Sequence, residues 1–347
     1  MFSLPKNGEC GGVPSGTEAY YSFDYGNVHF VHLNSHDIPK DSVGEMAQWL
    51  KSDLSQNQQM WTVAIWHHPP YSFGTHLSDG DSNMTQMRTQ INPIIENFHV
   101  DLVLNGHSHV YERSFPIRGH FGPSATFLPN MKQSNQPGRY PADCGYKKKK
   151  RGEGTIYLTC GVSGQFGWGP LGYPSTAVDF VERGSLILDV EVNKFQIRFI
   201  NEQGEGKDSL TIFKEVGKKH SLQICPGKVE KLVASWPGNH LWSNGDTTRT
   251  LQFQSDLPGQ FTFSVSDGFG CLSDTFLVKV LEVPVLNLGP DTVLNPGETL
   301  LLSTNIPGQY LWNTGQTSSQ ISANANGKYW LQITLENGCV ISDTLYT

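Results

Sequence analysis

Short apolar runs alternate with amphipathic stretches over the first 216 residues. The runs at 61–66 and 100–104 are too short for buried helices and rich in β-branched residues, so each predicts an inner strand. The segment between them has apolar residues at helical spacing, namely Met84, Met87, Ile91, Ile95 and Phe98. We expect this helix to take Asp81 or Asn83 as its N-cap and to be kinked or restarted by Pro93. A right-handed crossover then makes the two strands parallel.

The same patterns predict a second helix and further strands. Ser42 and Glu45 have the spacing of a capping box, and the apolar face behind them comprises Val43, Met46, Ala47, Leu50 and Leu54. Strands are expected at 30–33, 155–159, 185–190, 195–200 and 211–214. The aperiodic stretch 114–153 is typical of a functional or disordered loop. Its five consecutive cations, 147–151, fit either a solvated loop or a phosphate-steering patch.

The character of the chain changes near residue 217, where an internal repeat begins. Trp242-Ser-Asn-Gly matches Trp312-Asn-Thr-Gly at an offset of 70 residues, and Gly270-Cys271 matches Gly338-Cys339 at an offset of 68. Alternating apolar positions and turn signals predict two small all-β sandwiches, at 217–283 and 284–347, with the tryptophans in their cores. We expect the second repeat to be truncated before its last strand finishes.

Composition favours a β-rich extracellular protein. The chain has 36 Gly and 20 Pro, 11% aromatic and only 16% charged residues. Its net charge of -7 argues against nucleic acid as a partner, and no apolar run approaches the length of a membrane span. We therefore expect a secreted, periplasmic or cell-surface location.

The six cysteines fit that setting. Cys225 and Cys271 bracket the first repeat, which predicts a disulfide between them and leaves Cys339 unpaired. Cys10 with Cys144 is a further candidate pair, and the partner of Cys160 stays open because connectivity cannot be read from spacing.

Histidines follow both central strands. His67 and His68 come directly after the first strand, and His107 and His109 after the second. Parallel strands bring their carboxyl ends to one edge of a sheet, where open α/β sheets bind ligands. A His-x-His pair can offer two nitrogens to a metal pair, whereas His68 is expected to point to the opposite side of the strand end and to be structural.

These motifs together resemble those of a known family. His67-x-Pro, and Gly106-His107-x-His109 followed by Tyr-Glu-Arg, are similar to the calcineurin-like metallophosphoesterases. The segment Tyr20–Gly26 and the His-Phe-Val at 29–31 resemble the purple acid phosphatase branch. The resemblance covers roughly residues 1–216. It implies the second half of a four-layer αββα sandwich, followed by the two immunoglobulin-like or PKD-like repeats common on secreted bacterial proteins.

The resemblance also implies a chemistry. His67 and His107 would bind one metal and His109 the other, with Fe, Zn or Mn as the ions. Two such metals lower the pKa of a bridging water and stabilise developing charge, so the expected reaction is hydrolysis of a phosphate monoester or diester. His76 would face the substrate phosphate as a cation or general acid. Its alternative role is that of an ordinary surface residue, since Leu77 stands where some relatives carry a second histidine.

The family's Asp-containing motifs, including its bridging Asp, do not occur in the sequence. The partial matches at 26–29 and 238–240 are not expected to bind metal. We therefore expect a fragment that is inactive alone, and two alternatives stay open. One is a surface binding or adhesion protein with a degenerate phosphoesterase region, which contacts cell surfaces or glycans through its repeats. The other is a phosphodiesterase or nucleotidase of the same fold.

Overall fold

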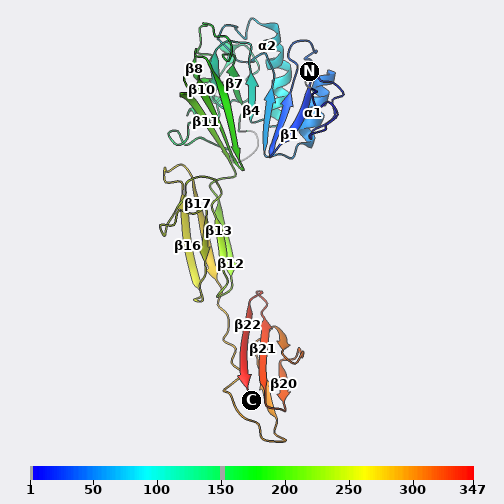
Figure 1. The fold of residues 1–347 in the computed structure, drawn as a ribbon, viewed down its shortest axis with the longest axis vertical. Coiled ribbons are helices and arrows are strands. Elements are labelled where there is room, and N and C mark those ends of the chain that lie inside the picture. The colour runs from blue at the N-terminus through cyan, green and yellow to red at the C-terminus, as the bar shows by residue number, and fades with distance from the viewer. Residues whose placement is uncertain (1–2, 149–152) are drawn as a thin grey trace. The chain divides into compact units, whose positions relative to one another are not determined.

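The computed structural model describes residues 3–148 and 153–347 (Figure 1). The contacts divide the chain into two units. The first comprises residues 1–217 with the short segments 235–239 and 266–273, and the second comprises the rest. The domain boundaries expected at 216/217 and 283/284 remain predictions.

The first unit is built on a seven-stranded mixed sheet. Its strand order is β1 (Tyr21–Tyr25), β2 (Val28–His32), β3 (Trp61–Ile65), β4 (Leu102–Asn105), β7 (Ile156–Cys160), β5 (Tyr111–Ser114) and β8 (Thr176–Phe180). The four strands from β2 to β7 in this order run parallel, with Ile65 opposite Leu104. The predicted parallel pair is therefore confirmed, and both of its strands end at the same edge.

The crossover between β3 and β4 is helical, as predicted, but in three parts. These are α2 (Ser82–Gln86), a π-helical turn (Met87–Ile91) and α3 (Asn92–Asn97). Asp81 is the N-cap of α2, and its side chain accepts a hydrogen bond from the Met84 N–H. Pro93 lies in the first turn of α3, directly after the π-helical turn.

The capping box predicted for the first helix is wrong. Helix α1 spans Glu45–Gln56, and its N-cap is Gly44, with no side-chain cap. Because the helix begins at Glu45, this residue occupies the first helical position and not the third, so Ser42 lies outside the cap. Val43 is 74% exposed and does not join the apolar face, whereas Met46, Ala47, Leu50 and Leu54 are buried as expected.

A second, four-stranded sheet covers the other face of the first. Its order is β6 (Tyr146–Lys148), β11 (Gly206–Lys214), β10 (Lys194–Asn201) and β9 (Gly184–Glu191). One apolar core joins the helices to the first sheet, and another lies between the two sheets. Figure 1 shows α1 and α2 on the side away from β10 and β11. In residues 3–148 and 153–217 three of the four expected layers are thus present, helix, sheet and sheet.

The long stretch 114–153 contains more structure than its sequence predicted. It holds two 3-10 turns, Ser124–Thr126 and Pro129–Met131, and the strand β6. Of the cation run, Lys148 pairs with the buried Asp101 at 2.9 Å, and the Lys147 ammonium donates to the carbonyl of Cys271 at 3.0 Å. The other three cations of the run, 149–151, lie outside the described residues. The two described lysines are structural.

Each repeat forms a small two-sheet β module. The first has β12 (Lys219–Ile224), β17 (Ser273–Val280), β16 (Gly259–Ser266) and β14 (Leu241–Trp242) in one sheet, with β13 (Glu230–Val233) and β15 (Thr250–Phe253) in the other. The second pairs β18 (Leu300–Ser303) with β20 (Gln320–Ala323), and β19 (Gln309–Trp312) with β21 (Lys328–Thr334) and β22 (Val340–Tyr346). Trp242 and Trp312 are both buried. Each indole N–H donates to the carbonyl six residues later, so the matching tryptophans are core residues with the same local geometry.

Both predicted disulfides are wrong. The structure pairs Cys144 with Cys271 and Cys225 with Cys339, and leaves Cys10 and Cys160 free. The physical reason is that β12 and β17 run parallel, so Cys225 follows one end of the pair and Cys271 precedes the other. Six residues of strand separate the two ends by about 20 Å, far beyond the reach of a disulfide.

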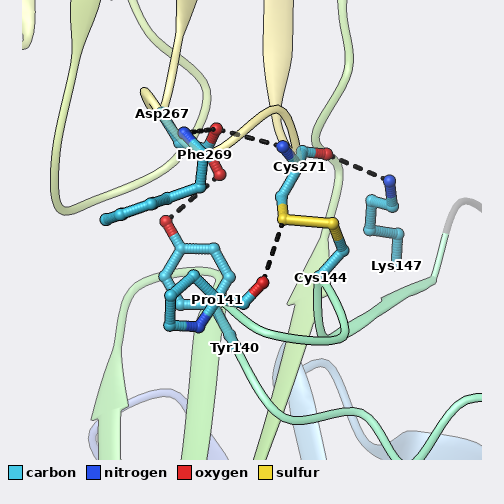
Figure 2. The surroundings of a disulfide bond; sticks show 7 residues. All are labelled: Tyr140, Pro141, Cys144, Lys147, Asp267, Phe269 and Cys271. Carbon is cyan, nitrogen blue, oxygen red and sulfur yellow. Dashed lines mark hydrogen bonds between the residues drawn. A yellow bond between two sulfur atoms is a disulfide. The ribbon is translucent and has the colours of Figure 1, made fainter.

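The Cys144–Cys271 bond lies within the first unit. Figure 2 shows its surroundings, where the hydroxyl of Tyr140 donates to the Asp267 carboxylate at 3.2 Å. The backbone N–H of Cys271 also donates to Asp267, at 3.1 Å. Two disulfides fit an extracellular or secreted protein. Among the helices in the described part of the chain, none is long and apolar enough to cross a membrane.

Candidate metal centre

The carboxyl ends of β3 and β4 bring histidines together as the sequence predicted. His67 and His68 follow β3, and His107 follows β4 after Gly106. His107 adopts a left-handed backbone conformation with φ of 60°, which a histidine adopts uncommonly and which occurs at functional sites. Its Nδ1 atom lies 3.2 Å from Nε2 of His67.

His76 reaches the same place from the loop after β3. This loop is closed by a hydrogen bond from the Ser78 N–H to the Ser72 carbonyl at 3.0 Å. The Ser72 hydroxyl also donates to that of Ser108, at 2.9 Å, which ties the loop to the segment after β4. The ring of His76 consequently stacks on the ring of His107, with 4.0 Å between their centroids.

His68 does not point away from the cluster, contrary to the expectation. Its ring centroid lies 4.5 Å from that of His107, and the side chain is buried. The Ser35 hydroxyl oxygen accepts from the His68 backbone N–H at 3.1 Å and lies 2.9 Å from its Nδ1. The expectation assumed that His67 and His68 point to opposite faces, as successive residues of a strand do. It failed because β3 already ends at Ile65.

His109 lies farther from the other rings. Its backbone N–H donates to the Thr75 hydroxyl at 2.9 Å, and its ring is 6.4 Å from that of His76. Among the described residues, it belongs to neither group of side chains close enough to share an ion. Its role as ligand of a second metal remains a prediction of the resemblance.

Two triads place their ligand atoms within 4.8 Å of one another. One comprises His67, His68 and His107, and the other His76, Asp81 and His107. Asp81 is the functional candidate that sequence reasoning missed, although its capping role was recognised. One carboxylate oxygen, Oδ2, lies 3.7 Å from Nε2 of His107. No sequence motif identifies Asp81 as a ligand, because it lies at the start of a helix and not at the end of a strand.

The electrostatics favour the neutral form of three of these imidazoles, those of His67, His68 and His107. Burial, reinforced by neighbouring histidines, lowers the pKa values of His67 and His107. Burial and the nearby His107 lower the pKa of His68 to about 4. Burial acts to raise the pKa of Asp81, but hydrogen bonds from the N–H groups of Met84 and Asn83 outweigh it and lower the pKa. The site therefore presents neutral nitrogen ligands and one carboxylate, which suit Zn, Fe or Mn.

This donor set fits one ion better than two. Two close cations repel each other strongly unless a bridging carboxylate lies between them. Within the two triads of the described residues, Asp81 is the sole carboxylate. Metal binding through these side chains fits the geometry, whereas the bridging ligand of a pair has no evident source among them.

The residues behind the cluster are structural partners. The carboxylate of Glu112 accepts from the Phe73 N–H at 2.8 Å, so it holds the loop that carries His76. Arg113 donates to Asp208 at 2.7 Å, and both side chains are fully buried. His29 lies between Asp24 and Asp53, at 2.7 and 2.8 Å, away from the cluster. The partial motif at 26–29 is therefore structural, as expected.

Comparison with known proteins agrees with the motifs. Residues 3–111 match the sequence model of the family described as calcineurin-like phosphoesterase. Purple acid phosphatases 15 and 13 of Arabidopsis thaliana are 37% and 38% identical to the chain over 117 residues. These matches cover 33% of this chain and 20% of each relative, so the chain spans about a fifth of the length of these curated relatives.

A solved structure of purple acid phosphatase PPD1 from yellow lupin seeds is similar at a TM-score of 0.46 and 19% identity. The similarity covers 56% of this chain and 32% of that one. Immunoglobulin-domain proteins also occur among the structural neighbours, such as the eight N-terminal domains of the Down syndrome cell adhesion molecule, at a TM-score of 0.24 and 13% identity. That similarity covers 49% of this chain and 30% of that one.

Proposed function

We propose that the protein takes part in metal-dependent hydrolysis of phosphate esters. One observation carries the proposal. Four histidines from two strand ends and one loop, His67, His68, His76 and His107, converge at one sheet edge. All four lie within residues 3–111, the stretch that matches the calcineurin-like phosphoesterase family. Convergence of separate sequence segments on one point is difficult to explain by packing alone, since imidazoles make a poor apolar core.

The ligand assignment follows the resemblance. His67 and His107 hold one metal and His109 the other, and the bound metals supply a hydroxide near neutral pH. His76 stacks on His107 and faces the phosphate as an anion-binding cation or general acid. The lowered pKa values of His67 and His107 keep their lone pairs available for coordination at neutral pH. The family's Asp-containing motifs do not occur among these 347 residues.

The test uses protein variants expressed in and purified from the native organism. His67→Ala, His107→Ala and His109→Ala should each abolish metal-dependent release of p-nitrophenol from p-nitrophenyl phosphate and lower the metal content measured by mass spectrometry. His76→Ala should keep the metals and lose turnover or phosphate affinity. His220→Ala is the control, because this histidine lies on β12 of the first repeat and belongs to neither triad. Unchanged turnover in the His107 variant would overturn the proposal.

The rival is a surface binding protein with a degenerate phosphoesterase region. The absence of the family's Asp motifs favours it, because without them a metal pair has few anionic ligands. In that case the β modules would carry the function through cell-surface or glycan contacts. Metal-dependent turnover in the natural protein excludes this reading. We propose a secreted, periplasmic or cell-surface location for either function.

A further inference from the structure

We propose that Trp168, together with Phe166 and Pro170, forms an aromatic platform beside the histidine cluster, and that this platform binds the planar ring of the substrate's leaving group. The inference rests on the proposed function and adds a substrate class to it. That class is phosphate esters whose alcohol part carries an aromatic ring, such as aryl and nucleoside phosphates. The platform contributes no metal ligand.

The platform residues share one side of the glycine-rich loop after β7. Phe166, Trp168 and Pro170 are exposed, whereas the residues between them, Gly167 and Gly169, are partly covered. Successive residues of an extended segment face opposite sides, so the three apolar side chains lie together on the side turned to solvent. A group of exposed apolar residues is typical of a binding surface, whereas a single exposed one is not.

Packing does not account for the ring of Trp168. It is 81% exposed, whereas six of the other seven tryptophans in the chain are buried. A side chain so exposed removes little apolar area from water and therefore stabilises the fold little. Its indole face is instead available to a planar ligand. Stacking of a nucleobase on an aromatic side chain typically changes affinity by about 5- to 100-fold.

Two glycines place Trp168 against the loop after β3. A Cβ at Gly167 would lie 2.4 Å from Cγ2 of Thr75, and one at Gly169 would lie 2.0 Å from the carbonyl oxygen of Gly74. The backbone on both sides of the tryptophan therefore touches this loop. Thr75 directly precedes the histidine that we propose to face the phosphate, so the platform lies beside the substrate site.

Backbone hydrogen bonds hold the platform on either side of its tryptophan. The Gly167 N–H donates to the carbonyl of His109 at 2.9 Å, and the Leu171 N–H donates to the carbonyl of Phe73 at 2.8 Å. The segment that carries Trp168 is thus fixed to both histidine loops before a ligand binds. A preorganised surface loses less entropy on binding than a mobile one does.

A cation lies beside the ring of Phe166. The guanidinium carbon of Arg183 lies 4.9 Å from the ring centroid, within the range of a cation–π contact. The carboxylate of Glu202 is 3.9 Å from this guanidinium, which is too far for a hydrogen bond, so the cation keeps donors for an anion. An aromatic surface with a cation at its side suits a ligand that is both planar and negatively charged, as a ring-bearing phosphate ester is.

The experiment compares esters that differ in their alcohol part. The substrates are phenyl phosphate, adenosine monophosphate and glycerol phosphate, and the enzyme is purified from the native organism. Trp168→Ala should raise KM about tenfold for the ring-bearing esters and leave KM for glycerol phosphate within about twofold. The value of kcat should be kept, because a contact with the ring is made equally in the ground state and the transition state. An effect on phenyl phosphate alone would place the platform next to the phosphate, and an effect on adenosine monophosphate alone would place it at the nucleobase; both outcomes support the proposal.

Binding of non-hydrolysable probes gives a readout that does not depend on turnover. In isothermal titration calorimetry, Trp168→Ala should raise the Kd of phenylphosphonate about tenfold and leave that of methylphosphonate within about twofold. Trp168→Phe keeps a ring and should restore most of the affinity. Tyr25→Ala is the matched control, because Tyr25 is 78% exposed but pairs with Val28 at the start of β2, at the sheet edge opposite the histidines. It should change neither constant.

The failure of the platform and that of the proposed function are distinguishable. An active enzyme in which Trp168→Ala affects ring-bearing and ring-free compounds equally, or affects neither, would overturn the platform alone. A wild-type protein that hydrolyses none of the three esters would overturn the proposed function, and the substrate class with it. Thermal unfolding of each variant shows whether the fold is kept.

Discussion

A single buried carboxylate, that of Glu112, holds the loop on which His76 depends. Its Oε1 atom accepts from the Phe73 N–H, and its other oxygen has no hydrogen-bond partner among the described residues. Burial raises the pKa of Glu112 to about 7, although hydrogen bonds from Ser72 and Phe73 oppose the shift. The carboxyl group is therefore largely protonated in the folded protein at mildly acidic pH.

This shift predicts a pH-dependent stability. Between pH 4.5 and about 7 the folded state binds more protons at Glu112 than the unfolded state, so the free energy of unfolding falls as pH rises through this range. The loss is on the order of 3 kcal/mol for a shift of this size. Glu112→Gln cannot ionise and should show a flatter pH dependence in denaturant titrations with a chelator present. Parallel curves for the two proteins would contradict the prediction.

At the scale of residues, the sequence predicted that the histidines after β3 and β4 reach one edge of the sheet, but not that His68 joins the cluster or that His109 lies farther from it. Asp81 was expected as a helix cap, and it is one. Its approach to His107, at 3.7 Å, is a tertiary contact that no local pattern encodes. The direction of His68 was mispredicted because the strand ends two residues before the histidine pair. Both cases turn on loop conformation, which the alternation of strands and the periodicity of helices do not describe.

At the scale of elements, the glycine-rich loop after β7 packs directly on the histidine loops. A Cβ at Gly169 would lie 2.0 Å from the carbonyl oxygen of Gly74, and one at Gly161 would lie 2.2 Å from that of Ser108. The Gly167 N–H donates to the carbonyl of His109 at 2.9 Å. The glycines let this loop approach the backbone that carries His76 and His109.

That contact predicts the effect of adding one methyl group. Gly169→Ala should push the loop off Gly74, lower the free energy of unfolding by about 1–3 kcal/mol and weaken Zn²⁺ binding at the histidine cluster. Gly164→Ala is a matched control, because a Cβ there meets no atom within 4 Å. Thermal unfolding measures the change in stability. Titration with Zn²⁺ in competition with a chromophoric chelator measures the change in metal affinity. Equal behaviour of the two variants would show that the close approach has no role.

Apolar patterning predicted the strands and helices whose buried residues are apolar. It did not predict elements whose buried residues are polar. The central strands β3 and β4 and the helices α1 to α3 follow from it. Strand β5, with the sequence Tyr-Glu-Arg-Ser, has every residue buried and was not predicted as a strand. Its Arg113 is neutralised by Asp208, far away in the sequence, so the burial of this strand depends on a tertiary pairing.

At the scale of the whole molecule, the cysteine pairing depends on topology that the sequence does not reveal. Both pairs join distant positions, with sequence separations of 127 and 114 residues. The repeat itself was read correctly, since the matching tryptophans occupy matching cores. The pairing was misread because spacing within a repeat suggested proximity, whereas parallel pairing of β12 with β17 places Cys225 and Cys271 at opposite ends.

This connectivity is directly measurable. Non-reducing peptide mapping of the protein from an oxidising compartment should yield two cross-linked peptides, Cys144 with Cys271 and Cys225 with Cys339. In the chain-entropy model, closing loops of this length stabilises the folded state by about 5 kcal/mol each. Cys271→Ser and Cys339→Ser should therefore lower the melting temperature, whereas Cys10→Ser, at an exposed free cysteine, should not. A peptide that joins Cys225 to Cys271 would contradict the parallel arrangement of β12 and β17, and with it the fold of the first repeat.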